Sequence, residues 1–245
     1  MKSTISIVII LTLFHTTLFA KKSYFNPYKP TVSKKIIKKR IKRKRKRVKK
    51  IKKKYRTTKF TKNLDRIYRK VLKKTDISRR ALKRAFEFYK KNRVKKGLSS
   101  KYLAIADYTK TARNKRLYII NLRNGAVYRH KIAHGKYSGA IGGRVKRSSN
   151  RRNSKMTPYG FFKVGSKVHK TKKRHYKYLS VQGLERSNRK VGYPPRLGGR
   201  DIILHPAKYV NYGGRSHGCF SICPQDRYKV FAKLKRALLY SYTGR

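Results

Sequence analysis

The chain of 245 residues contains 72 lysines and arginines against 7 aspartates and glutamates, a formal net charge of +65. Charge of this size favours contact with phosphate, sulfate or carboxylate polymers, most strongly at low salt, and says little about the fold. Hydrophobic residues still make up 38% of the chain. This excludes a chain that is disordered throughout, because the second half has enough apolar surface to build a core.

Residues 1–20 have the pattern of a secretory signal peptide: Lys2, a mostly apolar run over 5–19, and the small residue Ala20. A run of about 15 residues is short for the roughly 20 that a membrane span needs, which disfavours an uncleaved anchor helix. We therefore expect an exported protein of the periplasm or cell wall, with no transmembrane span in the mature chain.

Residues 21–62 form a low-complexity basic arm in which isolated isoleucines and valines stand among clustered positive charges. Self-repulsion and scarce apolar surface predict disorder for this segment. It is either a solubilising or processing segment or a tether to an anionic polymer, and we favour the tether. Nuclear localisation, which such a run also suggests, is incompatible with a signal peptide.

Helical periodicity begins in residues 63–97, where apolar residues recur three and four positions apart. They are Leu64, Ile67, Tyr68, Val71 and Leu72, followed by Ala81, Leu82, Ala85, Phe86 and Tyr89. Ser78 is the expected N-cap of the second helix, and Gly97 is the expected stop. We expect these helices to pack on the domain that follows.

Residues 98–245 read as one domain that is mainly β with flanking helices, of the α+β class. The expected strands, rich in aromatic and β-branched residues, are 102–108, 116–122, 126–133, 160–169, 178–183 and 201–205. Asn124-Gly125 predicts a hairpin between the second and third strands. Long loops over 139–157 and 185–199 suggest function or mobility. Pro224 is expected to begin a terminal helix, with Val230, Phe231, Leu234 and Leu238 on one face.

The two cysteines, Cys219 and Cys223, are expected to be free thiols. In a strand their Cα atoms would lie about 13 Å apart. A disulfide spans only about 4.4–6.8 Å. A helix through both would bring them together, but Gly218 and Pro224 make such a helix improbable.

A strand that ends at His205 and a Ser216-His217-Gly218-Cys219 sequence bring a thiol and imidazoles within 15 residues. A nucleophilic thiol needs a depressed pKa, which His205 and the helix that begins near Pro224 would supply. Gly218 would let backbone N–H groups form an oxyanion site. A buried structural cysteine, or a metal site that also uses Cys223, are the alternatives, although the spacing differs from paired CxxC zinc patterns.

The Ser-His-Gly-Cys block, with His205 before it, looks like the signature of the L,D-transpeptidase (YkuD-like) catalytic domain family. Blocks at residues 105–108, 116–118, 133–139, 154–160 and 183–185 resemble one branch of that family. The resemblance covers the chain from about Leu64 to the terminal helix. It implies a curved β-sandwich or barrel with a groove over the cysteine, a C-terminal helix, and a short helical region before it.

The resemblance also implies roles for individual residues. Cys219 would attack the carbonyl that follows the L-centre of diaminopimelate in a peptidoglycan stem peptide, and His205 would be its base. His217, Gly218 and the Cys219 N–H would line the oxyanion site, while Ser216 positions the loop. Arg215, His134, Ser138 and Tyr159 are the expected substrate contacts, although a structural role for His134 is about as plausible. No cofactor or metal is implied.

Transfer of the acyl group to a second stem would give a 3→3 cross-link, whereas transfer to water would make the protein an L,D-carboxypeptidase. The sequence leaves this choice open. A secreted polyanion-binding basic protein and another kind of cysteine hydrolase are the remaining alternatives. No DNA- or RNA-binding motif appears, so we expect no specific nucleic-acid site.

Overall fold

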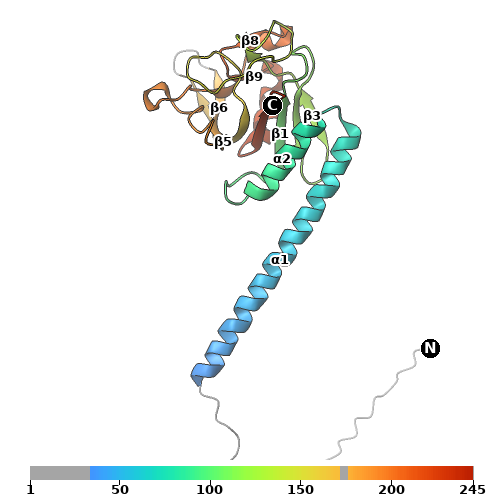
Figure 1. Cartoon of the computed structure of the whole chain (residues 1–245), viewed down its shortest axis with the longest axis vertical. Coiled ribbons are helices and arrows are strands. Elements are labelled where there is room, and N and C mark those ends of the chain that lie inside the picture. Colours follow the sequence, from blue (N-terminus) through green and yellow to red (C-terminus); the bar gives the residue numbers. More distant parts are fainter. Residues whose placement is uncertain (1–33, 172–175, 245) are drawn as a thin grey trace, which may run out of the picture. The chain divides into compact units, whose positions relative to one another are not determined.

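The computed structural model describes residues 34–171 and 176–244, and the chain divides into two compact units, Met1–Lys52 and Lys53–Arg245 (Figure 1). The predicted signal peptide, and residues 21–33 of the basic arm, lie outside the described residues. No helix in the described part of the chain combines the length and the apolar character that a membrane span requires.

Helix α1, Lys34–Lys74, corrects the prediction of a disordered arm, because it continues through residues 34–62 without a break. The physical reason is backbone propensity. Lysine and arginine are good helix formers, and the segment contains no proline or glycine after Pro30. Ile36 and Ile41 are 48% and 47% exposed, so these apolar side chains do not belong to a core.

The helical region predicted at 63–97 is present as the end of α1 and as α2, Arg79–Asn92. The periodic apolar face is buried as expected, at Leu64, Ile67, Val71, Ala81, Leu82, Ala85, Phe86 and Tyr89. Ser78 is the N-cap of α2, but its side chain makes no capping bond. Its backbone N–H instead donates to Asp107 Oδ2 at 2.9 Å, which fixes α2 to the end of a strand.

Eight strands form one mixed sheet in the order β3-β2-β1-β10-β5-β6-β7-β9. They are β1 (Tyr102–Asp107), β2 (Leu117–Asn121), β3 (Val127–His130), β5 (Gly160–Lys170), β6 (Lys177–Gly183), β7 (Ile203–Pro206), β9 (Phe220–Ile222) and β10 (Leu238–Tyr242). The short strands β4 (His134–Gly135) and β8 (Arg215–Ser216) pair separately. The predicted β2–β3 hairpin is confirmed, and Gly125 adopts a φ of +75° in its turn.

The sheet curves until its two edges nearly meet. An antiparallel bridge joins Ile132, just after β3, to Ile222 of β9, and the Ala133 N–H donates to Ser221 O at 2.9 Å. Because β3 and β9 are the opposite edges of the sheet, this bridge brings its ends together. The predicted curved, mainly β fold is confirmed.

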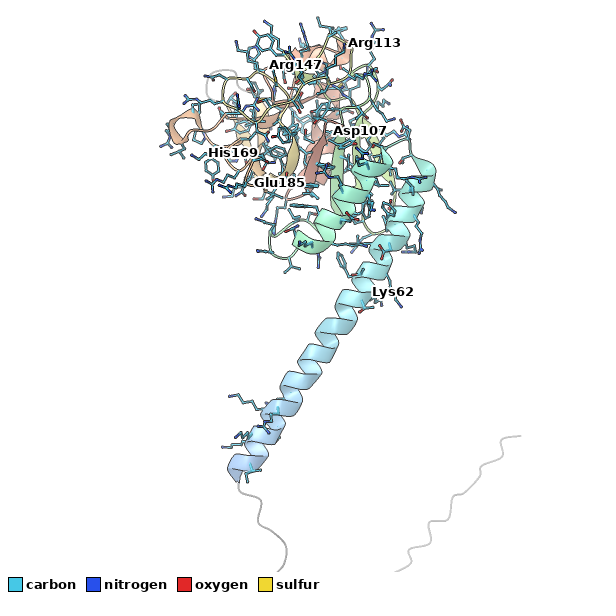
Figure 2. All side chains as sticks on the ribbon, in the orientation of Figure 1. Lys62, Asp107, Arg113, Arg147, His169 and Glu185 are labelled. Carbon is cyan, nitrogen blue, oxygen red and sulfur yellow. The ribbon has the colours of Figure 1, made fainter. Side chains whose placement is uncertain are left out.

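Strand alternation gives the curved sheet an inner and an outer core. In β1, Ala104 and Ala106 face the inner cluster, which also holds apolar residues of α3 (Arg227–Leu234). Leu103 and Ile105 face the outer cluster, which α1 and α2 cover. Figure 2 shows Asp107 beside α2 and Arg113 and Arg147 among the loops at the other end of the domain.

The C-terminal helix is shorter than predicted. A 3-10 turn, η3 (Pro224–Asp226), leads into α3, which ends at Leu234, and the chain then forms β10 between β1 and β5. Leu238, predicted on a helix face, instead pairs with Leu103 and Lys163. The reason is that β10 is buried on both faces, so its continuous apolar pattern could not be told from that of a buried helix.

Candidate active site

His205 lies on strand β7, and Cys219 directly precedes the neighbouring parallel strand β9. In the β7–β9 pair, Leu204 is opposite Phe220 and His205 is opposite Ser221. Leu204 and Phe220 enter the inner core, so alternation places His205 and Ser221 on the other face, while Cys219, just before β9, packs partly against the inner core. From the strand geometry, the Cα atoms of His205 and Cys219 are roughly 8 Å apart. The predicted relation between thiol and imidazole is therefore compatible with the fold.

The His205 imidazole has a defined tautomer. Its Nδ1 lies 3.0 Å from Pro206 O, and its Nε2 lies 3.0 Å from Ser221 Oγ. A carbonyl oxygen can only accept, so Nδ1 must carry the hydrogen, and Nε2 carries none in the neutral ring. Tyr176 stacks on the ring with centroids 5.1 Å apart. The lone pair on Nε2, which a general base would use, therefore accepts the hydrogen of Ser221 in the neutral ring.

The environment of Cys219 favours a resting thiol. Burial raises the pKa of Cys219, a backbone hydrogen bond from Ile203 lowers it, Asp201 raises it, and Arg200 lowers it. Burial also lowers the pKa of Arg200 to about 10, although the neighbouring Cys219 opposes that shift. Because the thiol keeps its proton at neutral pH, a base must remove it before the sulfur can attack a carbonyl.

The prediction that a helix N-terminus lowers the pKa of Cys219 is wrong. Strand β9 stands between Cys219 and η3, and Cys223 rather than Cys219 is the N-cap of that turn. Four residues of extended chain cover about 13 Å, beyond the short reach of helix-end charges. The same intervening strand keeps the cysteines apart, and both are free as predicted.

The loop before Cys219 is held by Ser216. Its Oγ accepts a hydrogen bond from the Gly218 N–H at 3.0 Å and donates to Cys219 O at 2.8 Å. These contacts agree with the predicted positioning role of Ser216. They also engage the Gly218 N–H, so of the predicted oxyanion donors the Cys219 N–H is the better candidate. The His217 side chain is exposed on this loop.

Gly218 is required by conformation and by space. Its φ is +114°, and a Cβ there would lie 2.6 Å from an Arg200 guanidinium nitrogen and 2.8 Å from Met156 O. Side chains rarely adopt this conformation, and a carbonyl cannot move away as a flexible side chain can. The loop can therefore approach Arg200 and Met156 only with glycine at 218.

His134 is buried beneath the same loop. Its Nδ1 lies 3.0 Å from a guanidinium nitrogen of the buried Arg116, which can only donate, so Nε2 carries the hydrogen. Burial first, and Arg116 second, lower the pKa of His134 to about 4. β4 pairs His134 with Arg215. The structure thus gives His134 the structural role that was the alternative to substrate contact.

The other predicted substrate residues also contact the protein itself. Arg215 donates to Lys136 O at 3.1 Å and to Gly139 O at 3.3 Å. Ser138 is buried, and its Oγ accepts from the Thr157 N–H at 2.7 Å. Tyr159 is half-buried, and its backbone N–H donates to Asn150 Oδ1. The contacts of Arg215 and Ser138 hold together the loops around Cys219.

Four residues near the thiol and imidazole were not predicted: Arg200, Tyr209, Ser221 and Tyr176. Ser221 could have been found, because it lies two positions after Cys219 in the sequence. The other three come from turns and strand ends with no periodic signal. Within residues 34–171 and 176–244, no group of three histidine, cysteine or acidic side chains could hold a metal ion.

A thiol just before strand β9 and an imidazole on the adjacent parallel strand β7 define a candidate cysteine acyl-transfer site. The chain matches the family model of the L,D-transpeptidase catalytic domain over residues 73–242, more than half of its length. It therefore belongs to the L,D-transpeptidase catalytic domain family, and the resemblance seen in the sequence is confirmed.

Solved structures give more distant similarities. The K307A mutant of the helical cell shape determining protein Pgp2 from Campylobacter jejuni has 16% identity and a TM-score of 0.39, with 59% of this chain and 49% of that chain covered. An L,D-transpeptidase from Xylanimonas cellulosilytica has 15% identity and a TM-score of 0.30, with 59% and 61% covered. The chain thus spans about half of Pgp2. The search of curated proteins found no match.

Proposed function

We propose that this protein is a peptidoglycan L,D-transpeptidase that forms 3→3 cross-links through a thioester on Cys219. One observation carries the proposal: Cys219 directly precedes β9, the parallel neighbour of the strand that holds His205, and His205 Nε2 lies 3.0 Å from Ser221 Oγ of β9. Membership of the L,D-transpeptidase family supplies the substrate class.

In the acylation step, Cys219 Sγ attacks the carbonyl carbon between the L-centre of diaminopimelate and D-alanine in a tetrapeptide stem. The thiol proton passes to His205 Nε2, and the Cys219 N–H stabilises the oxyanion. When the peptide bond breaks, the imidazolium gives the proton to the departing amine of D-alanine. The product is a thioester on Cys219.

In the second step, the side-chain amine of another stem attacks the thioester carbonyl. The amine loses a proton to His205, the carbon–sulfur bond breaks, and the Cys219 thiol is restored. Attack by water at this point would give a tripeptide stem and L,D-carboxypeptidase activity. The positive charge of Arg200, close to Cys219, would favour the developing thiolate and the carboxylates of the stem peptide.

The direct test is incubation of the purified protein with muropeptides that carry tetrapeptide stems, followed by mass analysis of the products. We expect dimers with 3→3 links from the wild type, no products from Cys219→Ala, and unchanged products from the buried control Cys223→Ala. Tripeptide monomers without dimers would show that the protein hydrolyses the stem instead of transferring it to a second stem. Formation of products by Cys219→Ala would show that Cys219 is not the nucleophile.

The proposal includes export to the periplasm or cell wall, where the substrate lies, and an anionic polymer as partner of the basic arm. Residues 34–62 contain no acidic residue, so their contact with a polyanion would release many counterions. We expect cosedimentation with anionic wall polymer to weaken steeply with salt. Deletion of residues 21–52 should reduce that salt dependence, and an unchanged slope would assign polymer binding to the catalytic domain.

A further inference from the structure

We propose that Ser221 and Tyr209 act as a hydroxyl pair that positions His205 for proton exchange with Cys219. The inference rests on the proposed function, because His205 is the base there. Both are positioning residues rather than catalytic residues, since they act through the imidazole. Ser221 belongs to β9, and Tyr209 belongs to η2 (Lys208–Tyr212), a 3-10 turn in the connection between β7 and β9.

The hydrogen bonds of the pair have a forced direction when the imidazole is neutral. Pro206 O fixes the hydrogen on His205 Nδ1, so Nε2 accepts, and Ser221 must donate its O–H across the 3.0 Å contact. Ser221 Oγ lies 2.7 Å from the Tyr209 hydroxyl. Because Ser221 has already used its one hydrogen, Tyr209 donates to it. The chain of donors runs from Tyr209 through Ser221 to His205.

The same pair can satisfy the imidazolium. Nε2 has one lone pair, so it can take the proton of Cys219 only as the Ser221 hydrogen turns away from it; the imidazolium N–H can then donate to Ser221 Oγ. The Ser221 hydrogen turns to the Tyr209 oxygen, which can accept as well as donate. No atom has to move far, since only hydroxyl hydrogens turn. The ring therefore keeps its orientation in both protonation states, which a proton shuttle requires.

The surroundings keep the pair in place and protonated. Ser221 is fully buried. Tyr209 is half-buried, and burial raises its pKa; the Ser221 hydrogen bond lowers it, and Cys219 raises it. The Gly214 N–H donates to Tyr209 O at 2.7 Å and so ties the turn to the loop that leads to Cys219.

Charged and titratable groups from other elements also face the site. Arg200 and Asp201, just before β7, act electrostatically on Cys219, and Tyr176, just before β6, acts on Tyr209 and stacks on His205. A test of the hydroxyl pair must leave these groups unchanged. Substitutions that remove only one oxygen meet this requirement.

The test is the rate of Cys219 alkylation by iodoacetamide between pH 6 and pH 10, in a Cys223→Ala background. The variants are Ser221→Ala and Tyr209→Phe. The matched controls are Ser166→Ala on the exposed part of β5 and Tyr212→Phe, 81% exposed in the same turn as Tyr209. This readout needs no wall substrate, and it reports how readily the thiol loses its proton.

We expect alkylation at pH 7 to slow on the order of ten-fold in Ser221→Ala and several-fold in Tyr209→Phe, because the base is misplaced. The rates of variants and wild type should converge near pH 10, where hydroxide removes the thiol proton. The controls should match the wild type throughout. A merely structural role would lower the rate at every pH, and that result, or no change at pH 7, would overturn the inference.

A His205→Ala variant separates failure of the inference from failure of the proposed function. If His205→Ala slows alkylation at pH 7 but Ser221→Ala and Tyr209→Phe do not, the hydroxyl pair has no positioning role and the base is retained. If His205→Ala also leaves the rate unchanged, His205 is not the base. Thermal unfolding of each variant checks that the fold persists, and Tyr209→Phe serves where Ser221→Ala fails to fold.

Discussion

The strand pairs β7–β9 and β4–β8 each bring a histidine to the loop that leads to Cys219, and the two imidazoles differ in the partner of one ring nitrogen. His205 Nε2 meets the hydroxyl of Ser221, which can donate or accept. His134 Nδ1 meets the guanidinium of Arg116, which can only donate. A proton on His134 Nδ1 would make it a donor that faces another donor, the Arg116 guanidinium. The partner of His205 can therefore accommodate a protonated ring, whereas the partner of His134 opposes protonation.

Burial strengthens the same contrast. His134 and Arg116 are fully buried, and Arg116 also donates to the carbonyls of Ile132 and Lys110. His205 is half-buried at the end of its strand. A histidine in this domain is thus assigned to catalysis or to structure by its partners and exposure rather than by its distance along the chain from the cysteine.

The largest expected effect is on product formation. His205→Gln should reduce it by about 10² to 10⁴-fold, the usual contribution of a general base, with little change in thermal stability. His134→Gln should instead lower the unfolding temperature, because the buried Arg116 loses an acceptor. Muropeptide turnover and thermal unfolding, measured on both variants, test this. Equal effects of the two variants on both readouts would show that the two histidines do not differ in role.

The next effect is a pH dependence of stability. The pKa of His134 is about 4 in the folded state, against an ordinary value of 6.5 for histidine. The unfolded chain therefore binds a proton first, and the stabilisation present above pH 6.5 is lost as the pH falls toward 4. We expect the wild type to lose about 2 kcal/mol between pH 7 and pH 5 from this group.

Urea unfolding at the two pH values measures that loss. His134→Gln should remove this component of the pH dependence, whereas the exposed control His169→Gln should keep it. A His134→Gln variant with the full wild-type slope would show that other groups cause the dependence.

The smallest effect concerns the loop that both histidines adjoin. Gly218→Ala combines a strained φ of +114° with a collision at Met156 O, whereas Gly198→Ala has a φ of +72° and its nearest neighbour 3.6 Å away at Lys190 Nζ. Denaturant unfolding should show Gly218→Ala less stable than Gly198→Ala by about 1 kcal/mol. We also expect slower Cys219 alkylation in Gly218→Ala alone. Equal behaviour of the two variants would mean that the loop relaxes freely.

Much of the fold around the site follows from local sequence patterns. Alternation located β1, β2, β5 and β6, and Asn124-Gly125 located the hairpin because that turn needs positive φ. The order of residues also brought Cys219 and His205 within 15 residues of each other. The position of Ser221, two residues after Cys219, would have added it to the predicted site.

The remaining features depend on contacts between distant residues. Arg116 and His134 are 18 residues apart, and no local pattern pairs a buried guanidinium with an imidazole. Arg200 and Tyr209 reach the site from loops. Strand β10 is buried on both faces, so its apolar run matched a helix as well as a strand. The helix over residues 34–62 was missed because charge repulsion was weighed above the helix propensity of lysine and arginine.

The most direct measurement of the central claim is the position of the acyl group during turnover. The protein is mixed with a tetrapeptide stem, quenched in acid and digested, and fragment masses separate Cys219 from Cys223. The account predicts an adduct on Cys219 with the mass of the stem minus D-alanine, formed at pH 7 far more slowly in His205→Gln. An adduct on Cys223, or turnover without any adduct on Cys219, would contradict it.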